Sequence, residues 1–500
     1  MPPGHDSVNG PRTWLPDPSH YPEQMTPLSA TVWFEALGLG LHDAARELGA
    51  PFGGFATRTE LGWAYEGELE PEWEHDPERL RRAALDVARR WEEALLPRVR
   101  EITAELERMR PDLPPPDEAV ALLDRLWELV REQWTIHFLV VLPAQIAAEL
   151  LNDAWVERFG DGDQLGAYRL LEGMDSPADD AVWALAESAR GEGVADLLRD
   201  LEAEHALARL RGTGPGRRFL RELDRYLERY GGRSRWHELS LPREADLPML
   251  TLEALRLALE SGKPPSRQDP PAPPPELEEL HAAVRRAYAL KELHSYEIDY
   301  PGLLATREAL RGFGHRLVGE GLLDDVDDVW LLERAELRRA LVEPLDLRSI
   351  VAERRAELER GRAEGPGEYL GEPPEERERH VALEKFYGSG GGELRGAGAS
   401  PGVAEGVARV VAGEADFARI RTGDILVTTT TTPAWTPLFP SLAGLVTETG
   451  GILSHAAVVA REYRLPAVVG AAGATTAIRD GMLVRIDGAA GTIAILRSSS

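Results

Sequence analysis

The sequence predicts a multidomain α+β protein, in which a large and mostly α-helical region is followed by a smaller region of short strands. In residues 76–262, apolar side chains recur at spacings of three and four positions, which is typical of amphipathic helices. From residue 396 onward, short apolar runs alternate with turn signals, which favours strands. Between these two regions, residues 364–393 are charged and rich in Gly and Pro, and we expect them to form a flexible hinge.

These changes in pattern divide the chain into four predicted ranges. Residues 1–70 are poor in helix signals and rich in Pro, Gly and aromatic side chains, so we expect an irregular or β N-terminal part. The helical body has breaks where Pro and Gly gather, at 111–116, 160–162, 176–177, 212–216 and 263–275. The predicted ranges are 1–70 for the N-terminal part, 71–363 for the helical domain, 364–395 for the hinge and 396–500 for the C-terminal domain.

Composition narrows the classes of function. Net charge is −28, from 57 basic and 85 acidic side chains, which argues against nucleic acid and anionic membranes as partners. Cysteine is absent, so disulfides and thiolate metal sites are excluded. No signal peptide is expected in residues 1–10, and the apolar run 138–142, which ends at Pro143, is too short to span a bilayer. We therefore expect a cytoplasmic protein.

The stretch 447–470 carries the first chemical signal. An apolar strand at 443–446 leads into Thr449, Gly450 and Gly451, then Ser454 and His455, and then a helical pattern that Pro466 stops. This order places His455 in the first turn of a helix, behind a Gly-rich loop. Unpaired backbone N–H groups and the positive end of the helix dipole would stabilise a phosphoryl group on the imidazole there. The alternative is an ordinary polar residue at a helix start.

The second chemical signal lies in residues 290–300, where a helical pattern ends before Pro301. Lys291, Glu292 and His294 fall within four positions, and Lys291 shares a helix face with His294. They offer a cation for a phosphoryl oxygen and two candidate bases for a hydroxyl proton. The alternative is a surface helix with an ordinary ion pair. His137, in the mostly apolar segment 134–142, is predicted to be a core histidine rather than part of a pocket lining.

The pattern T-G-G-x-x-S-H-x-A-x-x-A-R-E at 449–462, with P-A-V-V-G at 466–470, resembles the swivelling phosphohistidine domain of the phosphoenolpyruvate-utilising enzymes. The opening W-x-x-D-x-x-H-x-P at 14–22 resembles the acceptor-binding domain of rifampicin phosphotransferase. The resemblance implies a mostly helical acceptor-binding domain followed by a small β/β/α swivelling phosphohistidine domain. It includes no nucleotide-binding domain of the ATP-grasp type.

Site residues are carried over from this resemblance position by position. The resemblance implies His455 as the phosphate carrier and Lys291, Glu292 and His294 as the other catalytic residues. It also implies a phosphate loop of Thr449, Gly450, Gly451 and Ser454, and acceptor-site candidates Arg233, Glu238, Asp299 and Arg307. No metal site is expected. The chain departs from the family pattern at Gly232, where relatives often have histidine, and at Thr432, where they usually have aspartate.

Three functions follow from this resemblance and stay open at this point. The first is a phosphotransferase component that receives a phosphoryl group on His455 and passes it to a hydroxyl of a small molecule, as in natural-product metabolism. The second is a dehydratase that acts through a phosphorylated hydroxyl, and the third is a phosphocarrier or regulatory protein without turnover. In each, ATP and Mg²⁺ are expected only through a separate ATP-grasp nucleotide-binding protein.

Overall fold

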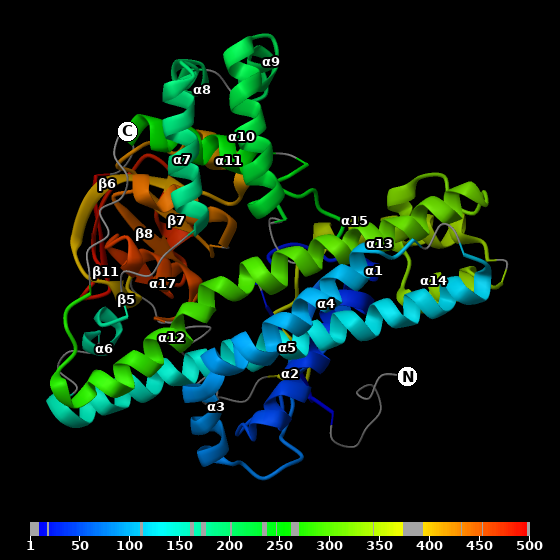
Figure 1. Ribbon diagram of the computed structural model, residues 1–500, viewed down its shortest axis with the longest axis horizontal. Coiled ribbons are helices and arrows are strands. Elements are labelled where there is room, and N and C mark those ends of the chain that lie inside the picture. Colours follow the sequence, from blue (N-terminus) through cyan, green and yellow to red (C-terminus); the bar gives the residue numbers. More distant parts are fainter. Residues whose placement is uncertain are drawn as a thin grey trace. The chain divides into compact units, whose positions relative to one another are not determined.

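A computed structural model describes residues 10–17, 20–110, 114–160, 165–171, 177–200, 203–232, 238–246, 248–261, 270–343, 345–373, 394–431, 433–452 and 454–497. The chain folds into two compact units (Figure 1). Unit 1 comprises residues 1–167, 236–241 and 273–377, and unit 2 comprises residues 168–235, 242–272 and 378–500. A large helical region and a C-terminal mixed sheet confirm the predicted α+β class.

Unit 1 is built around the long helix α5 (Pro116–Phe159), against which α2 (Glu35–Leu48), α3 (Pro77–Arg90) and α12 (Glu278–His294) pack (Figure 1). Pro143 lies inside α5, so the helix continues past the end of the apolar run 138–142. By length and composition α5 could cross a membrane, but 56% of its most apolar window is buried inside the protein. Here it serves as a core helix.

The remaining helices of unit 1 are mostly short. They are α1 (Pro27–Ser29), η1 (Ala30–Phe34), η2 (Trp91–Leu95), α4 (Leu96–Glu107), η3 (Pro275–Leu277), η4 (Ser295–Asp299), α13 (Tyr300–Gly319), η5 (Val326–Leu331), α14 (Arg334–Ala340) and α15 (Leu347–Glu364). A four-stranded sheet has the order β2-β3-β1-β4, from β1 (Thr13–Pro16), β2 (Phe55–Glu60), β3 (Trp63–Glu68) and β4 (Leu370–Gly371). All its pairs are antiparallel.

The N-terminal part differs from its predicted irregular or β character, because residues 27–48 are helical. This helix was not predicted because Gly38 and Gly40 lower the helix propensity of the segment. Both are needed for close packing: a Cβ on Gly38 would lie 2.8 Å from the Phe55 carbonyl oxygen, and one on Gly40 would lie 2.6 Å from the Cβ of Trp134. The strands β2 and β3 agree with the β character expected for this part.

Unit 2 combines helices with a seven-stranded mixed sheet of order β11-β10-β6-β7-β8-β9-β5. Strands β6 to β9 run parallel, and the flanking pairs are antiparallel. The strands are β5 (Ala397–Ser400), β6 (Val403–Val410), β7 (Ile425–Thr428), β8 (Gly444–Thr447), β9 (Ala467–Val469), β10 (Leu483–Asp487) and β11 (Thr492–Arg497). The helices are α7 (Pro177–Gly191), α8 (Ala195–Asp200), α9 (Ala203–Arg211), α10 (Gly214–Tyr230), α11 (Met249–Ser261), η6 (Glu414–Arg419), η7 (Pro433–Ser441), α17 (His455–Glu462) and α18 (Ala474–Ala477), while α6 (Gly166–Arg169) spans the division.

Helices α7 to α11 share one apolar core with the C-terminal sheet, and this core includes Leu255, Phe219, Phe417 and Leu445. Arg256 of α11 also donates from Nη2 to the Ile420 carbonyl oxygen at 3.1 Å. The division into ranges 1–70, 71–363, 364–395 and 396–500 stays a prediction. The boundaries of the two compact units differ from those of these ranges, because part of the helical region packs with the sheet. Most of the expected hinge, residues 374–393, lies outside the described residues.

Candidate functional site

The loop between β8 and α17 positions His455 as the sequence predicted. Ser454 has an extended backbone (φ −61°, ψ 159°) and is the N-cap of α17, where its Oγ accepts from the Ala457 N–H at 3.4 Å. Gly450 has a φ of 93°, a left-handed conformation that favours glycine, and a Cβ there would lie 2.9 Å from Ser454. His455 is therefore the first residue of the helix and follows a tight turn.

Thr436 of η7 is a side-chain neighbour of the His455 ring. Its Oγ1 lies 3.0 Å from His455 Nε2, and Thr436 is 4% exposed, whereas His455 is half-buried. A buried hydroxyl at this distance orients the imidazole. No role for Thr436 was predicted from the sequence. Thr432, where the chain departs from the family pattern, lies outside the described residues.

Buried hydrogen bonds fix the loop in front of His455. Thr449 donates from Oγ1 to the Thr429 carbonyl oxygen at 2.9 Å, which ties the loop to the end of β7. Arg461, 2% exposed, donates from Nη1 to the carbonyl oxygens of Ile452 at 2.7 Å and Ala399 at 3.0 Å. The helix start thus presents its first-turn N–H groups and positive dipole end from a rigid loop, an arrangement that stabilises an anion.

A second cluster lies in unit 1, where His137 of α5 meets His294 and Asp299. His137 Nδ1 lies 2.7 Å from Asp299 Oδ1, and His294 Nε2 lies 3.4 Å from Asp299 Oδ2. The two imidazole centroids are 4.8 Å apart. Of these residues, the sequence reading proposed His294 and Asp299 for the site and favoured a core role for His137. The structure brings all three together.

A π-helical turn explains why Asp299 reaches His294. Five steps on an α-helix at about 100° each would leave the two side chains roughly 140° apart around the axis. In η4 the Tyr300 N–H instead bonds to the Ser295 carbonyl, five residues back, which widens the turn. Residues five apart are then neighbours, so the α-helical spacing assumed from the sequence missed this pair. Pro301, directly after the run, is the sequence feature that marks it.

Burial and mutual charge set the ionisation of this cluster. Burial lowers the pKa of His137 and outweighs the opposing effect of the Asp299 carboxylate. For His294 burial also acts to lower the pKa, but Asp299 and the Leu290 carbonyl raise it overall. Burial alone would raise the pKa of Asp299, yet the two histidines hold it well below its usual range. Asp299 is therefore a buried carboxylate that two imidazoles contact.

Lys291 and Glu292 lie one turn away on α12. Lys291 donates from Nζ to Gln145 Oε1 at 2.7 Å, and its ammonium lies 5.7 Å from the centre of the Tyr288 ring. Glu292 is half-buried, and its charge contributes to raising the pKa of His294. The carboxylate next to the His294 ring is that of Asp299.

Glu238 and Arg307 lie in another part of unit 1. Glu238 is 2% exposed and accepts hydrogen bonds from Thr26 Oγ1 at 2.7 Å and Ser29 Oγ at 2.6 Å. Arg307 donates from Nη1 to the Leu239 carbonyl oxygen at 2.8 Å. These contacts anchor the segment 238–241 to the helical body. Arg233 and His237 lie outside the described residues, while Gly232 ends the described part of that turn.

The N-terminal segment places another His–Asp pair in unit 1. His20 Nδ1 lies 2.7 Å from Asp17 Oδ2. Desolvation opposes protonation of this ring, but the charge and hydrogen bond of Asp17 raise the pKa of His20 to about 9. His20 is thus a cation at neutral pH, and its charge contributes to lowering the pKa of His137.

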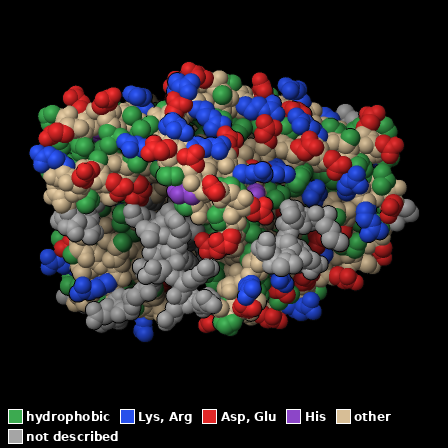
Figure 2. Space-filling model, turned by 90° about the horizontal axis from the view of Figure 1, so that it is seen from below, with side chains coloured by type: hydrophobic (Ala, Val, Ile, Leu, Met, Phe, Trp, Pro, Cys, Tyr) green, Lys and Arg blue, Asp and Glu red, His purple; other side chains and the backbone are tan. Residues whose placement is uncertain are grey.

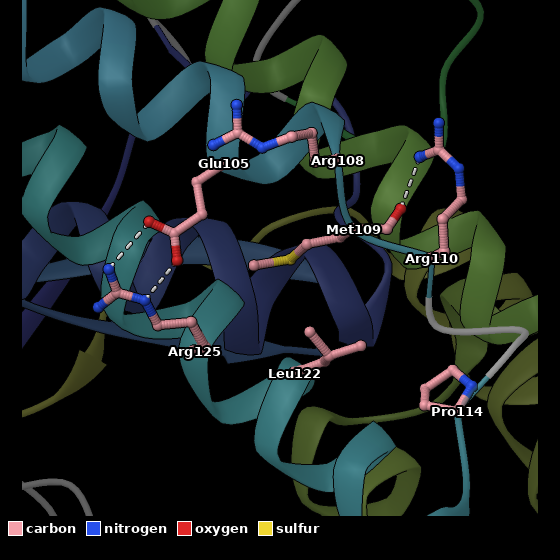
Figure 3. A pocket seen from close by; sticks show the side chains of 7 residues that line it. All are labelled: Glu105, Arg108, Met109, Arg110, Pro114, Leu122 and Arg125. Carbon is pink, nitrogen blue, oxygen red and sulfur yellow. Dashed lines mark hydrogen bonds and ion pairs between the residues drawn. The ribbon is translucent and has the colours of Figure 1, made fainter.

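Two cavities in the described part of the chain lie elsewhere in unit 1. One, of about 410 Å³, lies between α4 and the start of α5, where Arg125 bonds both carboxylate oxygens of Glu105 (Figure 3). The other, of about 310 Å³, is lined by residues around Trp73 and His75. Neither lining includes His455 or His294. On the face in Figure 2, described acidic and basic side chains are interspersed.

Comparisons with known proteins agree with this geometry. Residues 420–491 match the mobile domain of PEP-utilising enzymes, and residues 137–294 match the fourth domain of rifampicin phosphotransferase. A chondramide synthase of Chondromyces crocatus is 31% identical over 97% of this chain and 14% of its own length. An uncharacterized phosphotransferase of Bacillus subtilis is 28% identical over 73% of this chain and 47% of its own length.

Another relative is more similar over a shorter stretch. A rifampicin phosphotransferase of Bacillus cereus is 56% identical over 19% of this chain and 11% of its own length. The chain thus spans less than half the length of each of these relatives. The matches to family models comprise the mobile domain and the fourth domain, and neither is a nucleotide-binding domain. The chain is therefore similar to the PEP-utilising enzymes over their mobile domain and to rifampicin phosphotransferase over its fourth domain.

Proposed function

We propose that this chain carries a phosphoryl group on His455 and transfers it to a hydroxyl of a small molecule bound in the helical region. In the loading step, a neutral imidazole nitrogen attacks a nucleotide phosphorus, so that an N–P bond forms and a P–O bond breaks. In the delivery step, the acceptor oxygen forms an O–P bond as the N–P bond breaks, and the hydroxyl proton passes to a base. Each step needs in-line geometry and cationic or N–H partners for the phosphoryl oxygens.

The observation that carries this proposal is the placement of His455. It combines a helix N-terminus, a Gly-rich turn and an oriented imidazole, with Nε2 3.0 Å from Thr436 Oγ1. An ordinary polar residue at a helix start needs none of the loop contacts made by Thr449 and Arg461. The match of residues 420–491 to the mobile domain of PEP-utilising enzymes supports the same assignment.

The acceptor side of the proposal rests on unit 1. Its cluster of His137, His294 and Asp299 offers bases in an apolar surrounding, where a hydroxyl proton can be accepted. Lys291, bonded to Gln145, lies one turn from His294 and could hold a phosphoryl oxygen. Natural-product hydroxyls are the class of acceptor that the rifampicin phosphotransferase likeness suggests.

The donor step is assigned to a nucleotide-binding domain of the ATP-grasp type outside these 500 residues. ATP and Mg²⁺ would act there, and this chain's own part in loading is to present the imidazole. A cytoplasmic setting, where ATP is available, fits this scheme.

A labelling experiment tests the proposal. The chain is incubated with Mg²⁺, with ATP labelled at its phosphates, and with an isolated ATP-grasp domain of a rifampicin phosphotransferase relative. We expect acid-labile, base-stable label on the wild type and none on His455→Ala. His315→Ala is the matched control, because His315 is an exposed histidine on α13 of unit 1, and it should label like the wild type.

Two results would count against the proposal. Equal label on His455→Ala and wild type would place the phosphoryl group elsewhere. The carrier role would be refuted if His455 acquires no label with either donor, the heterologous ATP-grasp domain or the ATP-grasp domain encoded nearest in the same genome. Label that accumulates and is then lost when candidate hydroxyl compounds are added, with a phosphorylated product, supports the acceptor step.

A further inference from the structure

The buried cluster in unit 1 has the composition of a metal site. His137, His294 and Asp299 each offer one ligand atom, and these atoms all lie within 4.8 Å of one another. We propose that the cluster binds one divalent first-row transition-metal ion, through His137 Nδ1, His294 Nε2 and the carboxylate of Asp299.

The ligand types select the class of metal. Two imidazole nitrogens and one carboxylate suit Zn²⁺, Fe²⁺ or Co²⁺, whereas Mg²⁺ and Ca²⁺ prefer oxygen ligands. Three protein ligands leave coordination positions open for water or for a hydroxyl oxygen. This set is characteristic of sites that work on a bound ligand rather than of closed structural sites.

The hydrogen bonding of His294 prepares it as a ligand. Its Nδ1 donates to the Leu290 carbonyl oxygen at 3.0 Å, which fixes the neutral tautomer with the lone pair on Nε2. That lone pair faces the carboxylate oxygen Oδ2 of Asp299 at 3.4 Å. In the protonated ring, a proton on Nε2 lies between these two atoms. A metal ion can replace that proton and bind both the nitrogen and the carboxylate oxygen.

A hydrogen bond to the backbone next to Asp299 stabilises the turn that carries this residue. Gln133, 2% exposed, donates from Nε2 to the Ile298 carbonyl oxygen at 3.1 Å, within the π-helical turn η4. Gly302 lets Gln133 come this close, because a Cβ at that position would lie 1.8 Å from Gln133 Nε2. π-helical turns occur often at functional sites. The turn therefore serves to aim the carboxylate rather than to shape the surface.

The surroundings suit a metal ion with restricted access. The side chains of His137, His294 and Asp299 are 11%, 11% and 9% exposed. The Trp134 and Phe138 rings lie 4.8 Å from the His137 ring, centroid to centroid. Apolar walls of this kind strengthen the interaction between the ion and its charged ligand.

Binding exchanges a proton for the ion. In the structure, His137 Nδ1 lies at hydrogen-bond distance, 2.7 Å, from Asp299 Oδ1. When the metal binds, Nδ1 releases its proton to solvent and forms a bond to the ion, and Asp299 exchanges that hydrogen bond for a metal–oxygen bond. Binding itself does not depend on the proposed phosphotransfer, whereas any use of the ion to polarise an acceptor hydroxyl rests on it.

The test uses the full chain, without a histidine tag, and Co²⁺ as the probe. After chelator treatment, one equivalent of Co²⁺ should bind and give visible d–d absorption. Elemental analysis of untreated protein should find a transition metal at close to one equivalent. Asp299→Asn and His294→Gln should each weaken Co²⁺ binding by at least about tenfold. His315→Gln, which changes an exposed histidine on α13, should leave binding unchanged.

Either of two results would refute the proposed metal site. One is wild-type protein that contains no metal and shows no d–d absorption with Co²⁺. The other is unchanged Co²⁺ affinity in a folded Asp299→Asn variant. If the variants fail to fold, X-ray absorption of the Co²⁺-loaded wild type decides, since fewer than two imidazole ligands would contradict the assignment. Labelling of His455 is measured in parallel. Loss of the metal site with intact labelling refutes this inference alone, and intact metal binding without labelling refutes the proposed function alone.

Discussion

Nε2 of His455 lies 3.0 Å from Oγ1 of Thr436, a hydroxyl that is almost completely buried. Thr436→Val keeps the side-chain shape and removes the hydroxyl. A hydrogen bond of this kind contributes about 1 kcal/mol, so we expect His455 to accept label about fivefold more slowly. Rapid-quench labelling measures the rate.

Thr436→Ser serves as the control, because it keeps the hydroxyl and loses a methyl group. It should label at close to the wild-type rate. If the valine variant labels as fast as the wild type, the hydroxyl does not orient the imidazole.

Ser454 caps α17, and its replacement tests whether the helix start is held by this side chain. Ser454→Ala should cost about 1 kcal/mol of local stability, which corresponds to roughly fivefold faster amide exchange in the first turn of α17. Hydrogen exchange with peptide resolution measures this. Ser454→Asp should preserve exchange protection, since aspartate is also a good cap, but should slow loading by adding negative charge beside the phosphoryl group. Equal loading in both variants would argue against an anion at this position.

The ion pair of His20 and Asp17 predicts a pH dependence of stability. The pKa of His20 is raised from 6.5 to about 9 in the folded protein. Its stabilising contribution is therefore complete below pH 6.5 and is lost as pH rises through 9. The ring is 47% exposed, so solvent screening limits the effect to about 1 kcal/mol or less.

Unfolding at a series of pH values, compared between wild type and His20→Gln, isolates this contribution. The difference between the two proteins should shrink as pH rises from 6.5 to above 9. A difference that grows with pH would contradict the assigned pKa direction.

Gly40 tests the close packing of α2 on α5. A Cβ on Gly40 would lie 2.6 Å from Trp134 Cβ, and we expect Gly40→Ala to destabilise unit 1 by about 2 kcal/mol through overpacking. Gly319→Ala is the matched substitution, because nothing lies within 4 Å of its added Cβ. It should stabilise by about 0.5 kcal/mol through higher helix propensity. Thermal unfolding of both variants provides the measurement, and a neutral Gly40→Ala would refute the contact.

Local signals in the sequence were enough to predict some of these features. The loop at 449–455, the helix that follows and the strands around it depend on glycines, a cap and apolar runs, which act over a few residues. The helix at 27–48 was missed because Gly38 and Gly40 serve packing between distant segments. Such packing leaves no periodic signal.

Packing between distant segments also explains why the sequence did not predict the contact of His137 with the cluster in unit 1. His137 and Asp299 are 162 positions apart in sequence, and their contact depends on how α5 and α12 pack. The pairing of His294 with Asp299 depends on a single π-helical turn, which α-helical spacing does not anticipate. Helical spacing suggested His294 and the family resemblance suggested Asp299, but only the fold brought them to His137.

The central claim is that His455 itself carries the phosphoryl group. Peptide mapping by mass spectrometry, under conditions that preserve phosphohistidine, tests this most directly after incubation with ATP, Mg²⁺ and an ATP-grasp domain. We predict one phosphoryl group, on the peptide containing His455, with fragment ions that place it on the imidazole and with loss of the group in acid. A phosphoryl group located on Ser454, Thr436 or another hydroxyl side chain instead would contradict the claim.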